Sequence, residues 1–236
     1  MENTTQEQEQ NTKSLRLDLQ DSGREGLQIG TRKDGKKYSV REHRMNFIFP
    51  TQWKKFSNAL RSPKAQLTFE TLIQTGARIN EARHIAEDDL DFERNMIKLR
   101  VTKTKAKKGE KKGKPRLIPV SSKFMKRLKK HFSTKEPGKL IGILSTPAAN
   151  LAMKKYLKQV GVKDYYMYSI HSIRKTHGNW LKIMGNLGLM KVDAMEICLR
   201  LGHDYNTFLS NYGSSSIMNN EDVQIAKEIF GDLYLR

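Results

Sequence analysis

Cysteine is nearly absent from this chain, since Cys198 is the single one among 236 residues. One thiol cannot form a disulfide within the chain, which excludes a small secreted domain held by disulfide bridges and is typical of a reducing compartment. Long apolar runs are also lacking, because no stretch approaches the roughly 18–20 apolar residues of a spanning helix. The first residues, MENTTQ, form neither the basic nor the apolar region of a secretion signal. We therefore expect a cytoplasmic protein that does not cross a membrane.

Acidic residues are scarce relative to basic ones, with 25 Asp and Glu against 44 Lys and Arg and a formal net charge of +19. This excess favours a polyanionic partner, nucleic acid first and an anionic membrane surface second. The lack of a spanning segment weighs against the membrane. With 236 residues, 37% of them hydrophobic, the chain can form one medium domain, or one domain with an appendage.

The composition divides the chain into an N-terminal arm, a folded domain and a helical tail. The predicted bounds are 1–44, 45–216 and 217–236. The arm is too short and too polar to be a stable domain alone, and its residues 1–13, which include no large apolar side chain, are predicted to be disordered. A hairpin that pairs Leu27–Ile29 with Tyr38–Val40 is predicted within the arm.

Hydrophobic periodicity predicts that the domain is mainly helical. Thr51 is suited to cap the first helix, and Gly76 to end the second. The helices predicted after the first are 64–75, 79–84, 122–131, 147–159, 172–184, 190–199, 205–212 and 221–230. Residues 96–101 and 117–120 alternate like strands after a turn at 89–92, which predicts a β-hairpin with a basic loop. The fold class is therefore α+β, mainly α with a small antiparallel β-sheet.

Segment 75–81, TGARINE, places an arginine where an anion can bind. Because Gly76 ends one helix, Arg78 lies near the start of the next, where free backbone N–H groups favour an anion. A guanidinium there can hold two phosphate oxygens in a fork, which a lysine cannot. Glu81, three residues on and on the same helical face, could orient this arginine as a supporting residue. A purely structural Arg–Glu pair is the alternative.

Segment 101–116 holds eight basic residues and one acid, Glu110. Most of them suit either a solvated loop or contacts to backbone phosphates, which add affinity for DNA but no sequence information. The candidates for such contacts are Lys105, Lys107, Lys108, Lys111, Lys112, Lys114 and Arg116. Lys103 differs because it lies at the end of a predicted strand, where the scaffold can aim it. A lysine so placed can protonate a leaving oxygen as a general acid.

Four further side chains suited to phosphate chemistry follow within 42 residues. His171 and Arg174 share one helical face through their i,i+3 spacing. His203 follows a glycine and starts the next element, which is again a position that favours an anion. Tyr212 precedes the polar segment GSSS. No single one of these residues is informative, so their order and spacing carry the hypothesis.

The remaining histidine in this part of the chain has no clear chemical role. His171, His177 and His203 could together bind a metal, but no HExxH pattern or carboxylate at a ligand spacing accompanies them. No metal site is predicted, and His177 is interpreted as a packed or supporting histidine. Lys175, beside Arg174, is a further candidate for contacts to DNA.

Together these motifs resemble the tyrosine recombinase (phage integrase) family. The resemblance runs from about Phe47 to Tyr212, and six positions of the family pattern are filled in family order. They are Arg78, Lys103, His171, Arg174, His203 and Tyr212. A chance match would have to fill all of them together. The resemblance implies the catalytic-domain fold of this family for residues 45–216.

The resemblance also implies an activity, namely cleavage and rejoining of double-stranded DNA at a specific recombination site, with no metal or other cofactor. The nucleophile would form a 3′-phosphotyrosyl bond and release a 5′-hydroxyl. The implied roles are nucleophile for Tyr212, phosphate clamp for Arg78, Arg174 and His203, general acid for Lys103, and proton transfer or orientation for His171. Members of the family generally act as tetramers on two duplexes.

Two ends of the chain differ in how well they suit the family. The tail carries an apolar stripe that could dock on its own subunit or on a neighbour, and in the family such a tail is often exchanged between protomers. The stripe consists of Val223, Ala226, Ile229, Phe230 and Leu233. Family members usually carry a separate helical domain before the catalytic one, whereas here the polar arm 1–44 precedes it. The sequence fits either a minimal recombinase or a fragment of a longer protein, and in both cases we expect weaker and more salt-sensitive DNA binding.

Two other functions stay open from the sequence. A relaxing topoisomerase of the related type IB would share the chemistry without exchanging strands between partners. A non-catalytic DNA-binding relative would keep the fold for regulation, although an intact set of six residues argues against it.

Overall fold

The structure is a computed structural model, and it divides into two units, Met1–Met45 and Asn46–Arg236. The residues that it describes are 28–31, 37–40, 47–100, 115–202, 204–206, 208 and 218–233. In the first unit, β1 (Gln28–Thr31) pairs antiparallel with β2 (Lys37–Val40). The predicted hairpin is thereby confirmed, with Ile29 opposite Ser39. The disorder predicted for residues 1–13 concerns residues outside the described ones.

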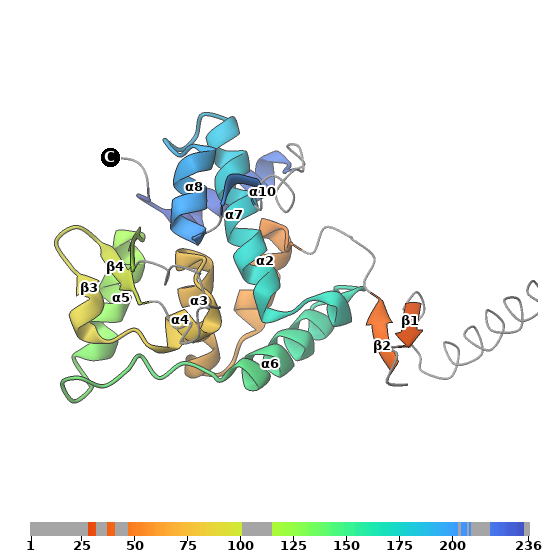
Figure 1. The fold of residues 1–236 in the computed structure, drawn as a ribbon, viewed down its shortest axis with the longest axis horizontal. Helices are drawn as coiled ribbons and strands as arrows, with labels where there is room; N and C mark the ends of the chain where they lie inside the picture. Colours follow the sequence, from red (N-terminus) through yellow and green to blue (C-terminus); the bar gives the residue numbers. More distant parts are fainter. Residues whose placement is uncertain are drawn as a thin grey trace, which may run out of the picture. The chain divides into compact units, whose positions relative to one another are not determined.

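The second unit is built mainly of helices (Figure 1). They are α2 (Pro50–Ala59), α3 (Pro63–Thr75), α4 (Ile79–Arg83), α5 (Ser122–Phe132), α6 (Thr146–Gln159), α7 (Ile170–Asn186), α8 (Ala194–Leu201) and α10 (Asn220–Phe230), with 3-10 turns η1 (Glu87–Asp89) and η2 (Tyr165–Met167). The longest, α7, packs against α3, α6 and α8. Each predicted helix within the described residues is found, but the one predicted over 190–199 begins only at Ala194, because the Asp193 side chain caps it by accepting the N–H of Glu196. The helix predicted over 205–212 falls largely outside the described residues.

A small antiparallel sheet has the strand order β3-β4-β5. Its strands are β3 (Leu90–Asp91), β4 (Met96–Leu99) and β5 (Arg116–Pro119). The predicted hairpin is confirmed, with Leu99 opposite Arg116 at the end that leads into the basic loop. The turn predicted over 89–92 is wrong at Leu90 and Asp91, because these two residues pair with Ile97 and Met96 as a third strand. The fold class, mainly α with a small antiparallel sheet, is confirmed.

Local sequence explains where the first helices begin and end. The prediction that Thr51 caps α2 is wrong. The helix begins one residue earlier, because Pro50 occupies its first position. The Gln52 side chain accepts the N–H of Phe49 at 3.1 Å. The next helix, α3, ends as predicted at Gly76, which has the left-handed φ of 63° that glycine adopts without strain. This turn delivers the chain to Arg78.

The core of the second unit surrounds α7. Trp180 is fully buried, donates its indole N–H to the Ile48 carbonyl at 2.9 Å, and lies edge-on to Trp53 with ring centroids 6.1 Å apart. Phe230 of α10 packs on Trp180 with centroids 5.9 Å apart. Burial of these aromatic side chains stabilises the packing of α2 and α10 on α7.

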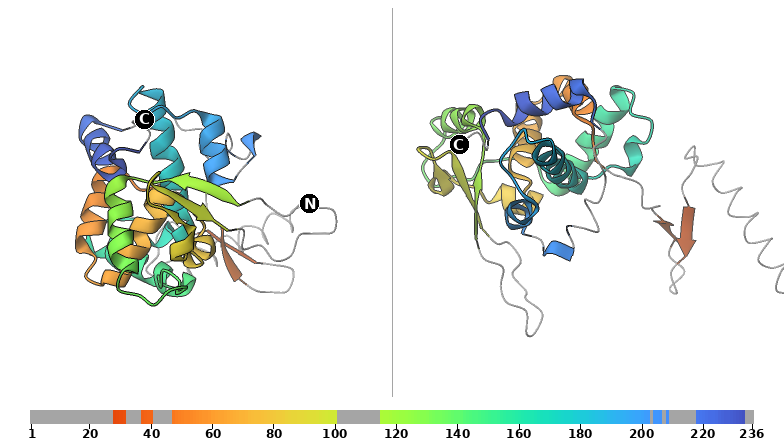
Figure 2. Two further views of the ribbon diagram at one scale, coloured as in Figure 1. Left: turned by 90° about the vertical axis from the view of Figure 1, so that its left-hand side faces the viewer. Right: turned by 90° about the horizontal axis from the view of Figure 1, so that it is seen from above.

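The tail packs on its own chain, where α10 lies along α2 (Figure 2). The Thr51 N–H donates to Asp222 at 3.0 Å, and the Ser122 N–H donates to Asp232 at 2.7 Å. Of the predicted apolar stripe, Ala226, Phe230 and Leu233 are buried, and Val223 and Ile229 are partly buried. Exchange of this tail between protomers stays a prediction.

Candidate functional site

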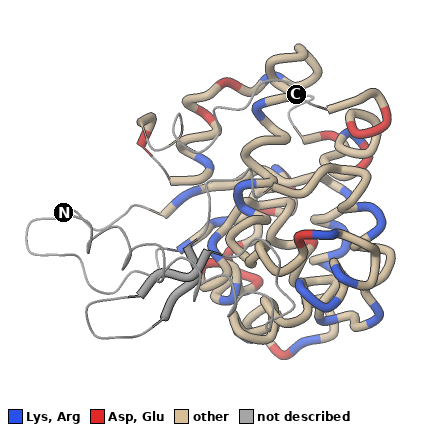
Figure 3. Tube along the Cα trace, turned by 90° about the vertical axis from the view of Figure 1, so that its right-hand side faces the viewer, with Lys and Arg blue, Asp and Glu red and all other residues tan. Residues whose placement is uncertain are grey.

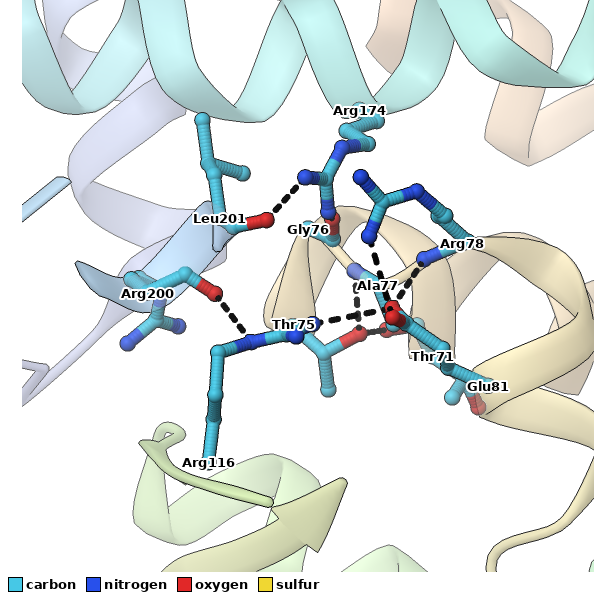
Figure 4. A network of polar contacts seen from close by, with 10 residues as sticks. All are labelled: Thr71, Thr75, Gly76, Ala77, Arg78, Glu81, Arg116, Arg174, Arg200 and Leu201. Carbon is cyan, nitrogen blue, oxygen red and sulfur yellow. Dashed lines mark hydrogen bonds and ion pairs between the residues drawn. The ribbon is translucent and has the colours of Figure 1, made fainter. Parts of the chain in front are cut away.

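The structure describes six of the side chains proposed from the sequence. They are Arg78, Glu81, Arg116, His171, Arg174 and Lys175. The other nine lie outside the described residues. They are Lys103, Lys105, Lys107, Lys108, Lys111, Lys112, Lys114, His203 and Tyr212. Arg78, Glu81, Arg116 and Arg174 meet around the end of α3, and with Arg200 they form what we call the arginine cluster (Figure 4).

Arg78 stands at the start of α4, and Glu81 orients it as the sequence predicted. Its backbone N–H donates to one carboxylate oxygen of Glu81 at 2.9 Å, and its guanidinium donates to the other at 3.1 Å. The side chain of Arg78 remains 40% exposed, whereas that of Glu81 is 4% exposed. Glu81 therefore holds the base of Arg78 and leaves the guanidinium at the surface, where it can meet an anion.

Glu81 also binds a second arginine. Arg116 donates to it at 2.9 Å and, through its Nε, to the Arg200 carbonyl at 3.2 Å. Burial alone would raise the pKa of Glu81, but the charges and hydrogen bonds of Arg116 and Arg78 outweigh it and hold that pKa below its ordinary value. Glu81 is therefore ionised at neutral pH. Arg116, proposed from the sequence as a phosphate contact of the basic loop, is part of this buried network.

Arg174 projects from α7 into the arginine cluster (Figure 4). It is 1% exposed, and its two terminal nitrogens donate to the carbonyls of Gly76, at 2.7 Å, and Leu201. These carbonyls stand at the C-terminal ends of α3 and α8, where helix carbonyls lack intrahelical partners and the helix dipole is negative. Two helix ends thus share one guanidinium, which fixes its orientation.

The backbone at Gly76 leaves no room for a side chain. A Cβ on this residue would lie 2.4 Å from Cδ2 of His177 and 2.8 Å from a methyl carbon of Leu201. Gly202, which ends α8 with a φ of 61°, is similarly close, since a Cβ there would lie 2.8 Å from Arg116. Glycine at both positions lets α3, α7, α8 and β5 meet at one point.

His171 lies on the first turn of α7, one helical turn before Arg174. The side chain is exposed, yet its pKa lies below the ordinary value because the surrounding chain keeps part of the water away from the ring and because of the charges of Arg174, Lys175 and Arg78. The ring is therefore neutral at pH 7 and can accept a proton. Its place three residues before Arg174 on α7 puts both side chains on one face of the helix, as their spacing predicted. Lys175 is half-buried.

One residue of the cluster, Arg200, was not expected to have a role there. Arg200 is 3% exposed on the last turn of α8, and its Nε donates to Nε2 of His177 at 2.8 Å. His177 is fully buried, which fits its interpretation as a packed histidine. A signal existed in the sequence, because Arg200 interrupts the apolar segment EICLRLG where a buried helix was predicted.

The electrostatic character of the site is strongly positive. Among the ten residues drawn in Figure 4 are the arginines 78, 116, 174 and 200, and one carboxylate, Glu81. Lys and Arg are also spread over much of the described trace, and Asp and Glu are fewer (Figure 3). A cluster of fixed guanidinium groups beside a neutral histidine is suited to hold an oxyanion such as a phosphodiester.

Neither a metal site nor a membrane-spanning helix is found among the described residues. No group of three or more His, Cys, Asp and Glu side chains within these ranges could hold a metal ion. None of the helices described is both long and apolar enough to cross a membrane.

Comparison with solved structures identifies the fold as that of tyrosine recombinase catalytic domains. The XerA recombinase shares 16% identity at a TM-score of 0.56, over 80% of this chain and 66% of that chain. The Tn1549 transposon integrase in complex with transposon right end DNA shares 17% identity at 0.56, over 79% and 66%. A lambda integrase (75–356) dimer bound to a COC′ core site shares 16% at 0.55, over 77% and 63%. This chain spans slightly less than two thirds of the length of each.

The sequence itself gives the family. The model of the phage integrase family matches residues 46–216, well over half of the chain, so the chain belongs to that family. No curated protein sequence matches it.

Proposed function

We propose that this chain is a site-specific DNA recombinase or integrase that cleaves and rejoins DNA through a 3′-phosphotyrosyl intermediate. The observation that supports this most is the meeting of Arg78 and Arg174, which are 96 residues apart in sequence, around the end of α3 (Figure 4). Family membership supplies the reaction class. The partner is double-stranded DNA, and the relatives whose structures include DNA support that assignment.

The reaction requires a nucleophile and stabilisation of the charge that builds at phosphorus. The Tyr212 hydroxyl attacks the scissile phosphate, forms a P–O bond to the 3′ side and displaces the 5′ oxygen. Arg78, Arg174 and His203 hold the non-bridging oxygens, and the fixed orientation of Arg174 means that little reorganisation is needed as charge develops.

Two side chains handle protons. Lys103 protonates the departing 5′ oxygen as a general acid, and His171 assists proton transfer from the nucleophile. The neutral state of the His171 ring at pH 7 is the state that such a base requires. Attack of a 5′-hydroxyl from a partner duplex reverses the step and needs no external energy source, because the phosphotyrosine retains the energy of the broken bond.

Other basic residues contribute affinity. Contacts to backbone phosphates are proposed for Lys105, Lys107, Lys108, Lys111, Lys112, Lys114, Arg116 and Lys175. For Arg116 the described bonds to Glu81 and the Arg200 carbonyl support a share in organising the site as well. The active assembly is proposed to be a tetramer on two duplexes, in which the tail of one protomer can dock on another.

The test is selection of a DNA substrate followed by covalent capture. Duplexes drawn from the DNA that flanks the gene, each with a nick that lets the 5′ fragment diffuse away, are incubated with the protein and screened for adducts that resist SDS. We expect an adduct with wild type and none with Tyr212→Phe. Absence of an adduct on every duplex, or its persistence in Tyr212→Phe, would contradict the proposal.

A plasmid-relaxation assay and a DNA-binding assay, run beside the adduct screen, separate the alternatives. Relaxation of supercoiled plasmid without recombinant products would favour the topoisomerase, and binding without any adduct would favour the non-catalytic relative. Within the recombinase hypothesis, Lys103→Ala should slow cleavage far more than it weakens binding in a gel shift. Equal losses would instead assign Lys103 to the phosphate contacts.

A further inference from the structure

The Arg200 side chain links the end of one helix to two others. Its Nε donates to Nε2 of His177 on α7 at 2.8 Å, and its terminal NH2 nitrogen donates to the Gln74 carbonyl at the end of α3, at 2.6 Å. The side chain is buried, so these bonds replace the water that a guanidinium would otherwise bind. Arg200 therefore ties the last turn of α8 to both neighbours.

The partner of Arg200 is fixed in one protonation state. Because a guanidinium can only donate, Nε2 of His177 must be the acceptor, which leaves the ring proton on Nδ1. Nδ1 then donates to the Ile73 carbonyl at 2.6 Å. The Phe230 ring closes over the imidazole edge-on, with centroids 5.6 Å apart. Burial and the charge of Arg200 keep the pKa of His177 well below its ordinary value, so this arrangement persists at neutral pH.

The hydrogen bonds of the Arg200 side chain fix the position of two backbone carbonyls that bind the other arginines. The carbonyl of Arg200 itself accepts from Arg116, and that of the next residue, Leu201, accepts from Arg174. Two consecutive carbonyls near the end of α3 also accept hydrogen bonds. The Ile73 carbonyl accepts from His177, and the Gln74 carbonyl accepts from Arg200. A shift of α8 relative to α3 would therefore move the guanidinium of Arg174.

We infer that Arg200, held by His177, is a positioning residue that sets the Leu201 carbonyl and through it the phosphate-facing orientation of Arg174. Neither side chain needs to touch DNA. The link also fixes where α8 ends at Gly202, immediately before His203. The catalytic consequence rests on the proposed function, whereas the effect on Arg174 does not.

Two substitutions at position 177 separate positioning from mere filling of the core. Gln keeps an acceptor for Arg200 and a donor for Ile73 but loses the ring. Phe keeps the ring shape against Phe230 but loses both polar contacts. Positioning predicts that His177→Gln retains function and His177→Phe loses it, while a role in packing alone predicts the reverse order.

The first arm of the experiment needs no DNA. In ¹⁵N-labelled full-length protein, exchange of the terminal Nη hydrogens of Arg174 with solvent reports how firmly the Gly76 and Leu201 carbonyls hold this guanidinium. We expect exchange to accelerate by about tenfold or more in His177→Phe, the effect of losing a hydrogen bond to a charged group, and to stay near wild type in His177→Gln. Leu199→Ala, on the exposed face of α8, is the control for a general change in that helix. Equal exchange in both variants, or faster exchange in His177→Gln, would overturn the inference.

The second arm measures single-turnover cleavage at saturating DNA, with the duplex selected as above. His177→Phe should be slowed by about 100-fold, the cost of a small misplacement of a catalytic group, and His177→Gln should stay within about tenfold of wild type. If His177→Phe does not fold, Arg200→Lys takes its place, because its ammonium keeps the charge without the fork. A variant that cleaves normally while Arg174 exchanges fast would also overturn the inference. If wild type cleaves no duplex, the proposed function fails while the first arm still decides the positioning role.

Discussion

The arginine cluster and the outer face of α5 carry the same kind of charge, but they hold it in opposite ways. Arg174 is 1% exposed and bonded to two helix-end carbonyls. On α5, the side that faces away from the core carries a row of exposed cations: Lys123, Lys126, Arg127, Lys129 and Lys130. An exposed lysine attracts polyanions without fixing their geometry, whereas a buried and bonded guanidinium can orient one phosphate. We therefore expect the exposed cations of α5 to contribute affinity for DNA, and the anchored Arg174 to contribute to cleavage.

The largest expected effect tests the anchored side of this comparison. Arg174→Ala should slow single-turnover cleavage of the selected duplex by about 10²–10³-fold, the usual cost of removing one donor that stabilises a charged transition state. Arg174→Lys should be almost as slow, because one ammonium cannot replace the fork held by Gly76 and Leu201. If both variants cleave normally once DNA is saturating, Arg174 contributes affinity only and the comparison fails.

The next effect concerns the carboxylate that holds two of the arginines. Glu81→Gln should lower the free energy of unfolding by about 2–3 kcal/mol at pH 7, since Arg116 and Arg78 lose a charged acceptor. Urea titration measures it. Because the folded-state pKa of Glu81 is lowered, this stabilisation is present above the ordinary glutamate pKa and is lost as pH falls through the folded value.

A matched ion pair on the surface provides the control for that substitution. Asp91 binds Arg94 at 3.1 Å with the same i,i+3 spacing, but the Arg94 side chain is 70% exposed. Asp91→Asn should therefore destabilise the protein much less than Glu81→Gln. Equal losses would mean that burial does not distinguish the two carboxylates.

A third effect comes from the buried histidine. The unfolded chain binds a proton at the ordinary pKa of histidine, but folded His177 does not, so stability should fall as pH drops below about 6.5. The slope due to this one group is at most about 1.4 kcal/mol per pH unit. Urea titrations of wild type and His177→Gln at a series of pH values should differ by that slope. Parallel profiles would show that His177 takes up a proton in the folded state.

The smallest effect is expected on α5. Replacing Lys126 and Lys130 together by Gln should change the free energy of unfolding by less than about 0.5 kcal/mol, and it should leave cleavage at saturating DNA unchanged. Thermal melts and the single-turnover assay measure the two. A loss of cleavage like that of Arg174→Ala would show that these exposed cations also have a geometric role.

Much of the fold follows from sequence because its signals are local. The periodicity of apolar residues located the helices, and Gly76 marked the end of α3. The third strand, Leu90–Asp91, could not be predicted, because two residues are too few to show alternation and only pairing with β4 defines them. Thr51 failed as a cap because the preceding proline was a stronger start signal.

The site divides in the same way. Arg78, Glu81 and Arg174 could be predicted, since spacing within one helix and position at a helix start are visible in the sequence. The partners of Arg200 could not, because its bonds to His177 and Gln74 depend on α3, α7 and α8 meeting in space. The bonds of Arg116 to Glu81 and to the Arg200 carbonyl likewise join segments that are 35 and 84 residues apart.

The proposed function requires that Tyr212 attacks a phosphate whose oxygens are held by arginines of fixed orientation. Its most direct test is to digest the trapped protein–DNA adduct and to identify by mass spectrometry the amino acid and the DNA end that are joined. We expect Tyr212 linked to a 3′-phosphate, with a free 5′-hydroxyl on the released fragment. A linkage to another residue, or to a 5′-phosphate, would contradict it.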